Sequence, residues 1–213
     1  MIKSWVKITD KSVTLNGQMM DFPSYGNALL TEIYRSKVKD YPKFFKMDAL
    51  CKLGFLGSEL VIQDENTNRF VPREDRAVIL FNRSGSLNAD VNFQATLQPD
   101  DFFPSPALFV YTLPNIITGE IAIRNKYLGE TSFYVLEKKD SETIASQIVA
   151  SFQDNITKSV IGGWVDCVDE NNFEAVMFLC YRDEKNKLHR QADGAEDGGR
   201  LSHGVQRHPT LCW

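Results

Sequence analysis

One continuous apolar run, Ala-Val-Ile-Leu-Phe at residues 77–81, constrains the fold of this chain more than any other feature. Five apolar residues in a row, without alternation, are typical of a parallel strand that is covered on both faces. A small-residue loop follows at 82–86, and a helical pattern then extends over 87–97. Strand, loop and helix in this order predict an α/β protein.

Strand and helix patterns alternate along the rest of the chain. The short link between the last two predicted strands indicates that they pair antiparallel. Gly54 and Gly57 lie in a predicted helix and allow it to approach a sheet closely. We therefore expect three layers, α/β/α, around a mixed, mostly parallel sheet of about five strands. The predicted helices are 27–37, 47–63, 87–97, 115–127 and 141–152, and the predicted strands are 5–8, 12–15, 77–81, 131–136, 159–165 and 173–179.

Length and charge bound the organisation of the chain. At 213 residues with 43% hydrophobic residues, one domain is expected, over 1–183. From Asn186 the sequence turns polar and rich in glycine, so an irregular polar tail is expected over 184–213, and its change of character after Lys187 also fits a variant terminus. The formal net charge is -4 and Lys and Arg look scattered, which argues against a nucleic-acid or membrane partner.

Neither a transmembrane segment nor a metal site is indicated. No apolar run is long enough to cross a bilayer and the first eight residues alternate, so a cytoplasmic location is expected. The four cysteines and three histidines have no metal-ligand spacing, which predicts reduced thiols, no metal and no cofactor. These residues are Cys51, Cys167, Cys180, Cys212, His189, His203 and His208.

The segment 104–140 combines a Leu-Pro-Asn turn, a helix, a stop at Gly129 and a short apolar strand. In order and spacing it resembles the β-ketoacyl synthases of the thiolase superfamily. Three further segments resemble landmarks of that family: 70–80 with its Ser/Gly loop, 159–165 with its Gly-Gly pair, and 173–179. The resemblance spans about residues 60–180 and implies the N-terminal half of a thiolase-like fold.

The resemblance also implies what is absent. In the family, the apolar strand delivers a nucleophilic cysteine to a helix N-terminus, where the helix dipole favours the thiolate. Here the four residues 137–140 are Glu-Lys-Lys-Asp, and Lys138 falls nearest to the family's nucleophile position. We interpret Lys138 as solvated and Asp140, with Glu142 in the first turn, as the cap of the next helix. A full synthase is about twice as long, and its second half supplies two histidines that match none here.

Other candidate groups have plain structural interpretations. Cys167 and Cys180 are expected in the core, and Ser84 and Ser86 in a turn, because no phosphate-loop pattern is present. Asn115 and Thr118 fit helix-start positions better than ligand contacts. An acyl or ligand cleft remains an alternative, with the aromatic residues nearby as its lining. Its candidate residues are Phe109, Tyr111, Asn115 and Thr118, with Phe102 and Phe103 beside them.

The strongest functional candidate is a surface. In the ketosynthase family, the strand before the nucleophile pairs with its copy across a two-fold axis. The resemblance assigns that role to Ser132, Phe133, Tyr134, Val135 and Leu136. The alternative is that this strand lies inside its own sheet, without a partner.

Three functions remain open. The first is a non-catalytic ketosynthase-like pseudoenzyme that forms a homodimer, or a heterodimer with a full ketosynthase, in fatty-acid, polyene or pigment acyl-chain biosynthesis. The second is an acyltransferase related to 3-oxoacyl-ACP synthases, with a non-family nucleophile or a site completed across a dimer. The third is a module that binds acyl groups or acyl carrier protein.

Overall fold

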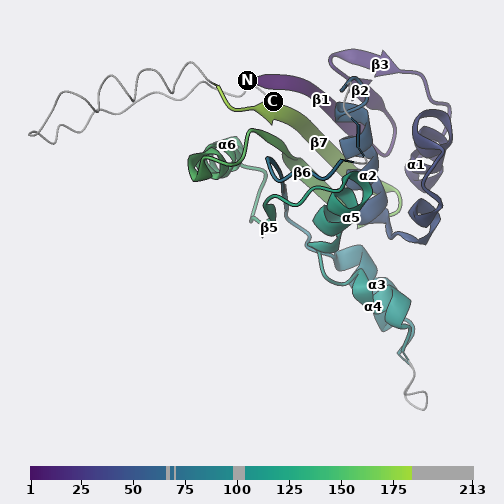
Figure 1. The fold of residues 1–213 in the computed structure, drawn as a ribbon. Helices are drawn as coiled ribbons and strands as arrows, with labels where there is room; N and C mark the ends of the chain where they lie inside the picture. Colours follow the sequence, from purple (N-terminus) through teal and green to yellow (C-terminus); the bar gives the residue numbers. More distant parts are fainter. Residues whose placement is uncertain (66–67, 70, 98–103, 184–213) are drawn as a thin grey trace, which may run out of the picture.

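A seven-stranded sheet runs through the computed structural model (Figure 1), which describes residues 1–65, 68–69, 71–97 and 104–183. The strand order is β3-β2-β1-β7-β6-β4-β5, so β3 and β5 form its two edges. The strands are β1 (Ile2–Thr9), β2 (Val13–Leu15), β3 (Gln18–Met20), β4 (Arg76–Asn82), β5 (Thr131–Val135), β6 (Ser159–Asp169) and β7 (Asn172–Tyr181).

The mixed α/β fold class is confirmed, with two corrections to the sheet. β4 is parallel to β5 and β6, but the other four neighbouring pairs are antiparallel, so the sheet is not mostly parallel. It has seven strands and not about five. The N-terminal segment accounts for both differences, because Asn16 and Gly17 take positive φ and turn the chain into the unpredicted strand β3. β1 then pairs with β7, and the expected antiparallel pair β6 and β7 is present.

The helices cover both faces of the sheet, which gives the three expected layers (Figure 1). α1, α2 and α5 pack on one face, around Val78, Ile161 and Met177. α6 covers the other face, around Ile79 and Trp164. The helices are α1 (Gly26–Ile33), the π-helix η1 (Tyr34–Val38), the 3-10 helix η2 (Pro42–Lys46), α2 (Ala49–Val61), α3 (Leu87–Gln94), α4 (Pro106–Val110), α5 (Ile116–Asn125), α6 (Ser141–Ser151) and the 3-10 helix η3 (Phe152–Asp154).

Glycines allow the close approach of α2 that the sequence predicts. Every residue of α2 except Lys52 is buried. A Cβ atom at Gly57 would lie 2.3 Å from Sδ of Met177 on β7, and one at Gly54 would lie 2.1 Å from Cδ1 of Ile117 on α5. A larger residue at either position would force the side chain of Ile117 or Met177 to shift, so glycine allows the close approach without that change.

The Gly-Gly pair of β6 has a similar role in the sheet. Gly163 has a φ of 140°, and a Cβ atom there would lie 2.1 Å from the carbonyl oxygen of Val176. A Cβ atom at Gly162 would lie 2.9 Å from Cδ1 of Ile148, on α6. A larger residue is thus excluded at Gly163 by the backbone of β7, whereas one at Gly162 would require the Ile148 side chain to shift.

A buried ionic network closes the amino end of the parallel strands. Arg76, at the start of β4, is fully buried, and its guanidinium donates to both carboxylate oxygens of Glu65 at 2.5 and 2.6 Å. It also donates to Ser159 on β6, to Tyr127 after α5 and to Tyr181 on β7. Burial alone would lower the pKa of Arg76, but Glu65 and Tyr127 raise it above its usual value. The network joins five segments at one end of the sheet.

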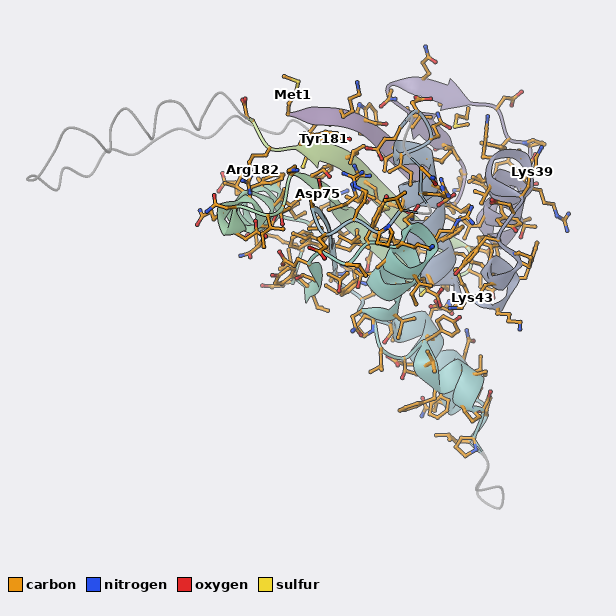
Figure 2. All side chains as sticks on the ribbon, viewed as in Figure 1. Met1, Lys39, Lys43, Asp75, Tyr181 and Arg182 are labelled. Atoms are coloured by element: carbon orange, nitrogen blue, oxygen red, sulfur yellow. The ribbon has the colours of Figure 1, made fainter. Side chains whose placement is uncertain are left out.

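The two termini of the described domain lie together. The ammonium group of Met1 donates to the carbonyl oxygen of Tyr181 at 2.7 Å, and Figure 2 shows the two residues side by side. The predicted tail, with its three histidines and Cys212, lies outside the described residues, as do Phe102 and Phe103. The division into a domain and a tail stays a prediction.

Candidate functional site

The carboxyl end of the parallel strands is where open α/β sheets commonly bind ligands. The turn after β4 is held there by its own polar groups. Nδ2 of the buried Asn82 donates to the carbonyl oxygen of Gly85 at 2.7 Å, and the Gly85 N–H donates to Oδ1 of Asn82 at 3.0 Å. Asp166, on β6, accepts from the N–H groups of Ser84 and Arg83 at 2.9 and 3.2 Å. These contacts support the interpretation of residues 82–86 as a turn.

The start of α6 carries a cap, as the sequence predicts. Oδ1 of Asp140 accepts from the Glu142 N–H at 3.4 Å, and Oδ2 accepts from the Thr143 hydroxyl at 2.5 Å. The bond from Thr143 and the neighbouring N–H groups lower the pKa of Asp140. The helix N-terminus is thus occupied by a carboxylate of this chain.

Lys138 lies in a solvated stretch. Both Glu137 and Lys138 are exposed, and Nζ of Lys139 lies 2.7 Å from Oε2 of Glu174. A nucleophilic lysine requires burial to lower the pKa of its amine. The side chain of Lys138 is exposed and lacks that burial.

The three described cysteines are buried, away from the start of α6. Burial raises the pKa of Cys167 to about 12 and that of Cys180 to about 11. Burial also raises the pKa of Cys51, in the first turn of α2. A raised pKa keeps a thiol protonated at neutral pH, which lowers its reactivity. Their positions agree with the predicted core role.

The four residues of the predicted cleft point to different surroundings. Phe109 is 53% exposed and its ring contacts Phe93 of α3, with centroids 5.4 Å apart. Tyr111 packs toward the main core, and burial raises its pKa to about 12. Thr118 is buried and its hydroxyl donates to the carbonyl oxygen of Asn115, whose own side chain makes no cap bond. The cleft therefore stays a prediction.

The predicted interface strand lies at an edge. Among the described residues β5 is the last strand of the sheet, which does not fit the alternative in which it lies inside its own sheet. Phe133 packs toward the core shared with α2 and α5, whereas the ring of Tyr134 stacks on Phe81 with centroids 5.1 Å apart. Val135 is 56% exposed. The strand is thus anchored by aromatic side chains on both faces.

The backbone groups of β5 face two directions. The carbonyl oxygen of Glu130 accepts from the Val78 N–H, and the Leu136 N–H donates to the carbonyl oxygen of Asn82. Because the polar groups of a strand alternate between its two edges, those of even-numbered residues face β4. Thr131, Phe133 and Val135 therefore present their N–H and C=O groups outward. Among the described residues, no further strand pairs with that edge.

An apolar hollow of about 520 Å³ adjoins the start of β5. Its walls include Ile123, 65% exposed, and Leu128, 64% exposed, together with Thr131 of β5. A second hollow of about 630 Å³ is lined by Pro72–Asp75, Asn155, Ile156 and Lys158. Neither hollow is lined by the predicted cleft residues.

Two features escaped the sequence analysis. Arg76 looks like one of several scattered charges, although it is buried among partners from distant segments. The second is a basic surface over residues 35–52, which contain six Lys or Arg and two Asp. A count of charge in short windows would have found it, and the description of the basic residues as scattered is wrong for this segment.

Two further searches cover the described residues only. Among them, no three His, Cys, Asp or Glu side chains are grouped as a metal site requires. No helix within these ranges has the length and apolar character needed to span a membrane.

Comparison with known proteins finds similarity in structure alone. No protein-family model matches this chain. No curated protein matches its sequence.

Solved structures share its fold. The ishigamide ketosynthase/chain length factor superimposes with a TM-score of 0.61 and 15% identity, over 86% of this chain and 62% of that one. A structure of a ketosynthase in complex with its chain length factor, from Xenorhabdus doucetiae, gives 0.59 and 10% identity, over 86% and 79%. A type II PKS acyl-carrier protein in complex with its ketosynthase gives 0.54 and 10%, over 90% and 66%. The chain has a ketosynthase-like, thiolase-type fold and spans less than two thirds of the first of these chains.

Proposed function

We propose that this chain is a non-catalytic, ketosynthase-like accessory subunit that pairs through β5 with a second copy or with a full ketosynthase. Its role would be in the assembly of a fatty-acid, polyene or pigment acyl chain in the cytoplasm. The observation that carries the proposal is the outer edge of β5, which presents the backbone groups of Thr131, Phe133 and Val135. Unpaired edge groups favour pairing with another chain.

The surroundings of β5 suit a partner of the same fold. The exposed side chain of Val135, and the apolar hollow lined by Ile123 and Leu128, add apolar surface next to the edge of β5. Two copies of β5 related by a two-fold axis perpendicular to the sheet run antiparallel, and Thr131 of one copy can then lie opposite Val135 of the other, with Phe133 on the axis. Such pairing would continue the sheet from one subunit into the next.

The described residues at the carboxyl end of the parallel strands support the non-catalytic part of the proposal. Asp140 caps α6 at the place where the family resemblance puts a thiolate, and the described thiols are buried elsewhere. Structures of the same fold in which a ketosynthase is paired with a chain length factor make a paired role reasonable for this chain. An acyl carrier protein as a further partner also remains a proposal.

Proline substitution at alternate positions of β5 tests the pairing. In Val135→Pro the lost N–H faces outward, so the subunit should fold but lose its partner. Tyr134→Pro is the matched control, because its lost N–H faces β4 and the change should destabilise the subunit itself. Size-exclusion chromatography with light scattering, on the chain alone and after co-expression with a full ketosynthase, measures the pairing. A wild-type chain that stays monomeric in both preparations would refute it.

Intact-mass spectrometry tests the absence of catalysis. The chain is incubated with an acyl thioester, alone and in its complex. We expect no acyl adduct on this chain, although a full ketosynthase in the same sample should be acylated. A stable adduct here would instead favour an enzyme with a nucleophile outside the family pattern.

A further inference from the structure

The short helices η1 and η2 bring a group of basic residues to the surface. Residues 35–52 carry a net charge of +4 in a chain of net charge -4, which leaves -8 on the other residues. Figure 2 shows Lys39 and Lys43 on the side of the molecule that carries α1. We call this region the η1–η2 surface and define it by Arg35, Lys37, Lys39, Lys43, Phe45, Lys46 and Lys52.

Tyr34 fixes the two helices against each other. Its ring stacks on Phe44 with centroids 4.3 Å apart and meets the edge of Phe45 at 5.1 Å. Its hydroxyl accepts from the Tyr41 N–H at 2.9 Å. Lys39 ends η1 with a positive φ, and its N–H donates to the carbonyl oxygen of Tyr34. Aromatic contacts therefore hold together the two short helices that carry most of these basic residues.

Within the described ranges, most of these charges lack an acidic partner. Lys43 is paired with Glu120 at 2.8 Å, and Asp40 in the same segment is paired with Arg124. No described residue forms an ion pair with Arg35, Lys37, Lys39 or Lys46, which are all exposed. Helix dipoles favour cations in the last turns of η1 and η2, but they do not account for a large apolar side chain among them. Phe45 lies there with 53% of its surface exposed.

We propose that the η1–η2 surface docks an acidic protein segment, with Phe45 as the apolar anchor and the four unpaired cations as its electrostatic complement. Charge complementarity of this kind speeds association and fixes orientation, and a desolvated aromatic residue supplies affinity. A nucleic acid or an anionic bilayer fits less well, because both extend beyond one small patch and would meet the net negative charge of the remaining surface. The proposal does not depend on the pairing of β5.

Fluorescence anisotropy with a labelled probe tests this proposal. The probe is a helical peptide with Glu on one face and Leu on the other. The wild-type chain should bind it saturably and more weakly as salt increases. A triple variant, Arg35→Glu with Lys37→Glu and Lys46→Glu, should weaken binding by about tenfold or more. Phe45→Ser should weaken it by a smaller factor without changing the salt dependence.

A matched triple variant separates the surface from net charge. Lys3→Glu with Arg83→Glu and Lys138→Glu makes the same change in charge at exposed positions elsewhere. It should change binding by less than about twofold, because those positions lie outside the surface. If the first triple variant does not fold, as judged by circular dichroism, the same three residues are changed to Gln.

Several results would overturn the proposal. Equal losses in both triple variants would show a net-charge effect only. Tighter binding of duplex DNA, or of vesicles that contain phosphatidylserine, would replace the acidic protein segment by another partner. A wild-type chain that does not bind the peptide at low salt would remove the docking surface.

Discussion

The two ends of the parallel strands differ in whether their charged side chains are buried or exposed. At the amino end, Arg76 and Glu65 are held inside the protein, with side-chain exposures of 0% and 10%, and every partner is a side chain of the same chain. At the carboxyl end, Glu137 and Lys138 are exposed, and Asp166 and Asp140 bind backbone N–H groups. The first end serves stability. The second, where open α/β sheets commonly bind ligands, contains turns and caps.

The largest expected effect concerns Arg76. Arg76→Met removes the cation but leaves Glu65 buried, so the free energy of unfolding should fall by about 3–5 kcal/mol. Chemical denaturation measures the change. The double variant Arg76→Met with Glu65→Leu should recover part of the loss, because it also removes the buried carboxylate. A loss below about 1 kcal/mol in the single variant would contradict the contrast between the two ends.

Acid should weaken the amino end next. Burial raises the pKa of Glu65, but the hydrogen bonds from Arg76 and Tyr181 together lower it by more than burial raises it. The pKa of Glu65 is therefore below its usual value. Stability from this lowered pKa is fully present above the unfolded pKa of about 4.3 and is lost as the pH falls through the folded pKa. The free energy of unfolding, measured from pH 7 to pH 3, should therefore fall less steeply in Glu65→Gln. Identical slopes in the two proteins would show that Glu65 does not contribute.

A smaller effect is expected from Asp166 at the carboxyl end. Asp166→Ala removes the acceptor for the N–H groups of Ser84 and Arg83, which should cost about 1–2 kcal/mol. Asp166→Asn keeps an acceptor oxygen and should cost less. A loss as large as that of Arg76→Met would mean that this end is as tightly built as the other.

Lys138 should have the smallest effect. Because the side chain is exposed, Lys138→Ala should change the free energy of unfolding by less than about 0.5 kcal/mol. It should also leave the mass of the complex in light scattering unchanged. A larger loss, or a changed complex, would show that the residue has partners beyond solvent.

Local patterns identified much of this fold, but long-range pairings escaped them. The run at 77–81 and the Gly-Gly pair of β6 identified their strands, because burial on both faces and close packing restrict residue type locally. The antiparallel pairing of β1 with β7 joins segments about 170 residues apart, and no local pattern shows it.

The candidate sites divide in the same way. The cap at Asp140 follows from its position before a helical pattern, and the structure places it there. The ionic network cannot be predicted from a local pattern, because Arg76 meets Glu65, Tyr127 and Tyr181 only in the folded chain. The edge position of β5 likewise depends on the strand order of the whole sheet.

The contact between Met1 and Tyr181 has a practical consequence. Since β1 and β7 are neighbours in the middle of the sheet, a short peptide could connect residue 183 to residue 1 without crossing either edge. New ends could then be opened at the turn between β6 and β7, near Glu170, which lies at the other end of β7 from Tyr181. A circularly permuted chain of this kind would keep β5 free of any fused tag.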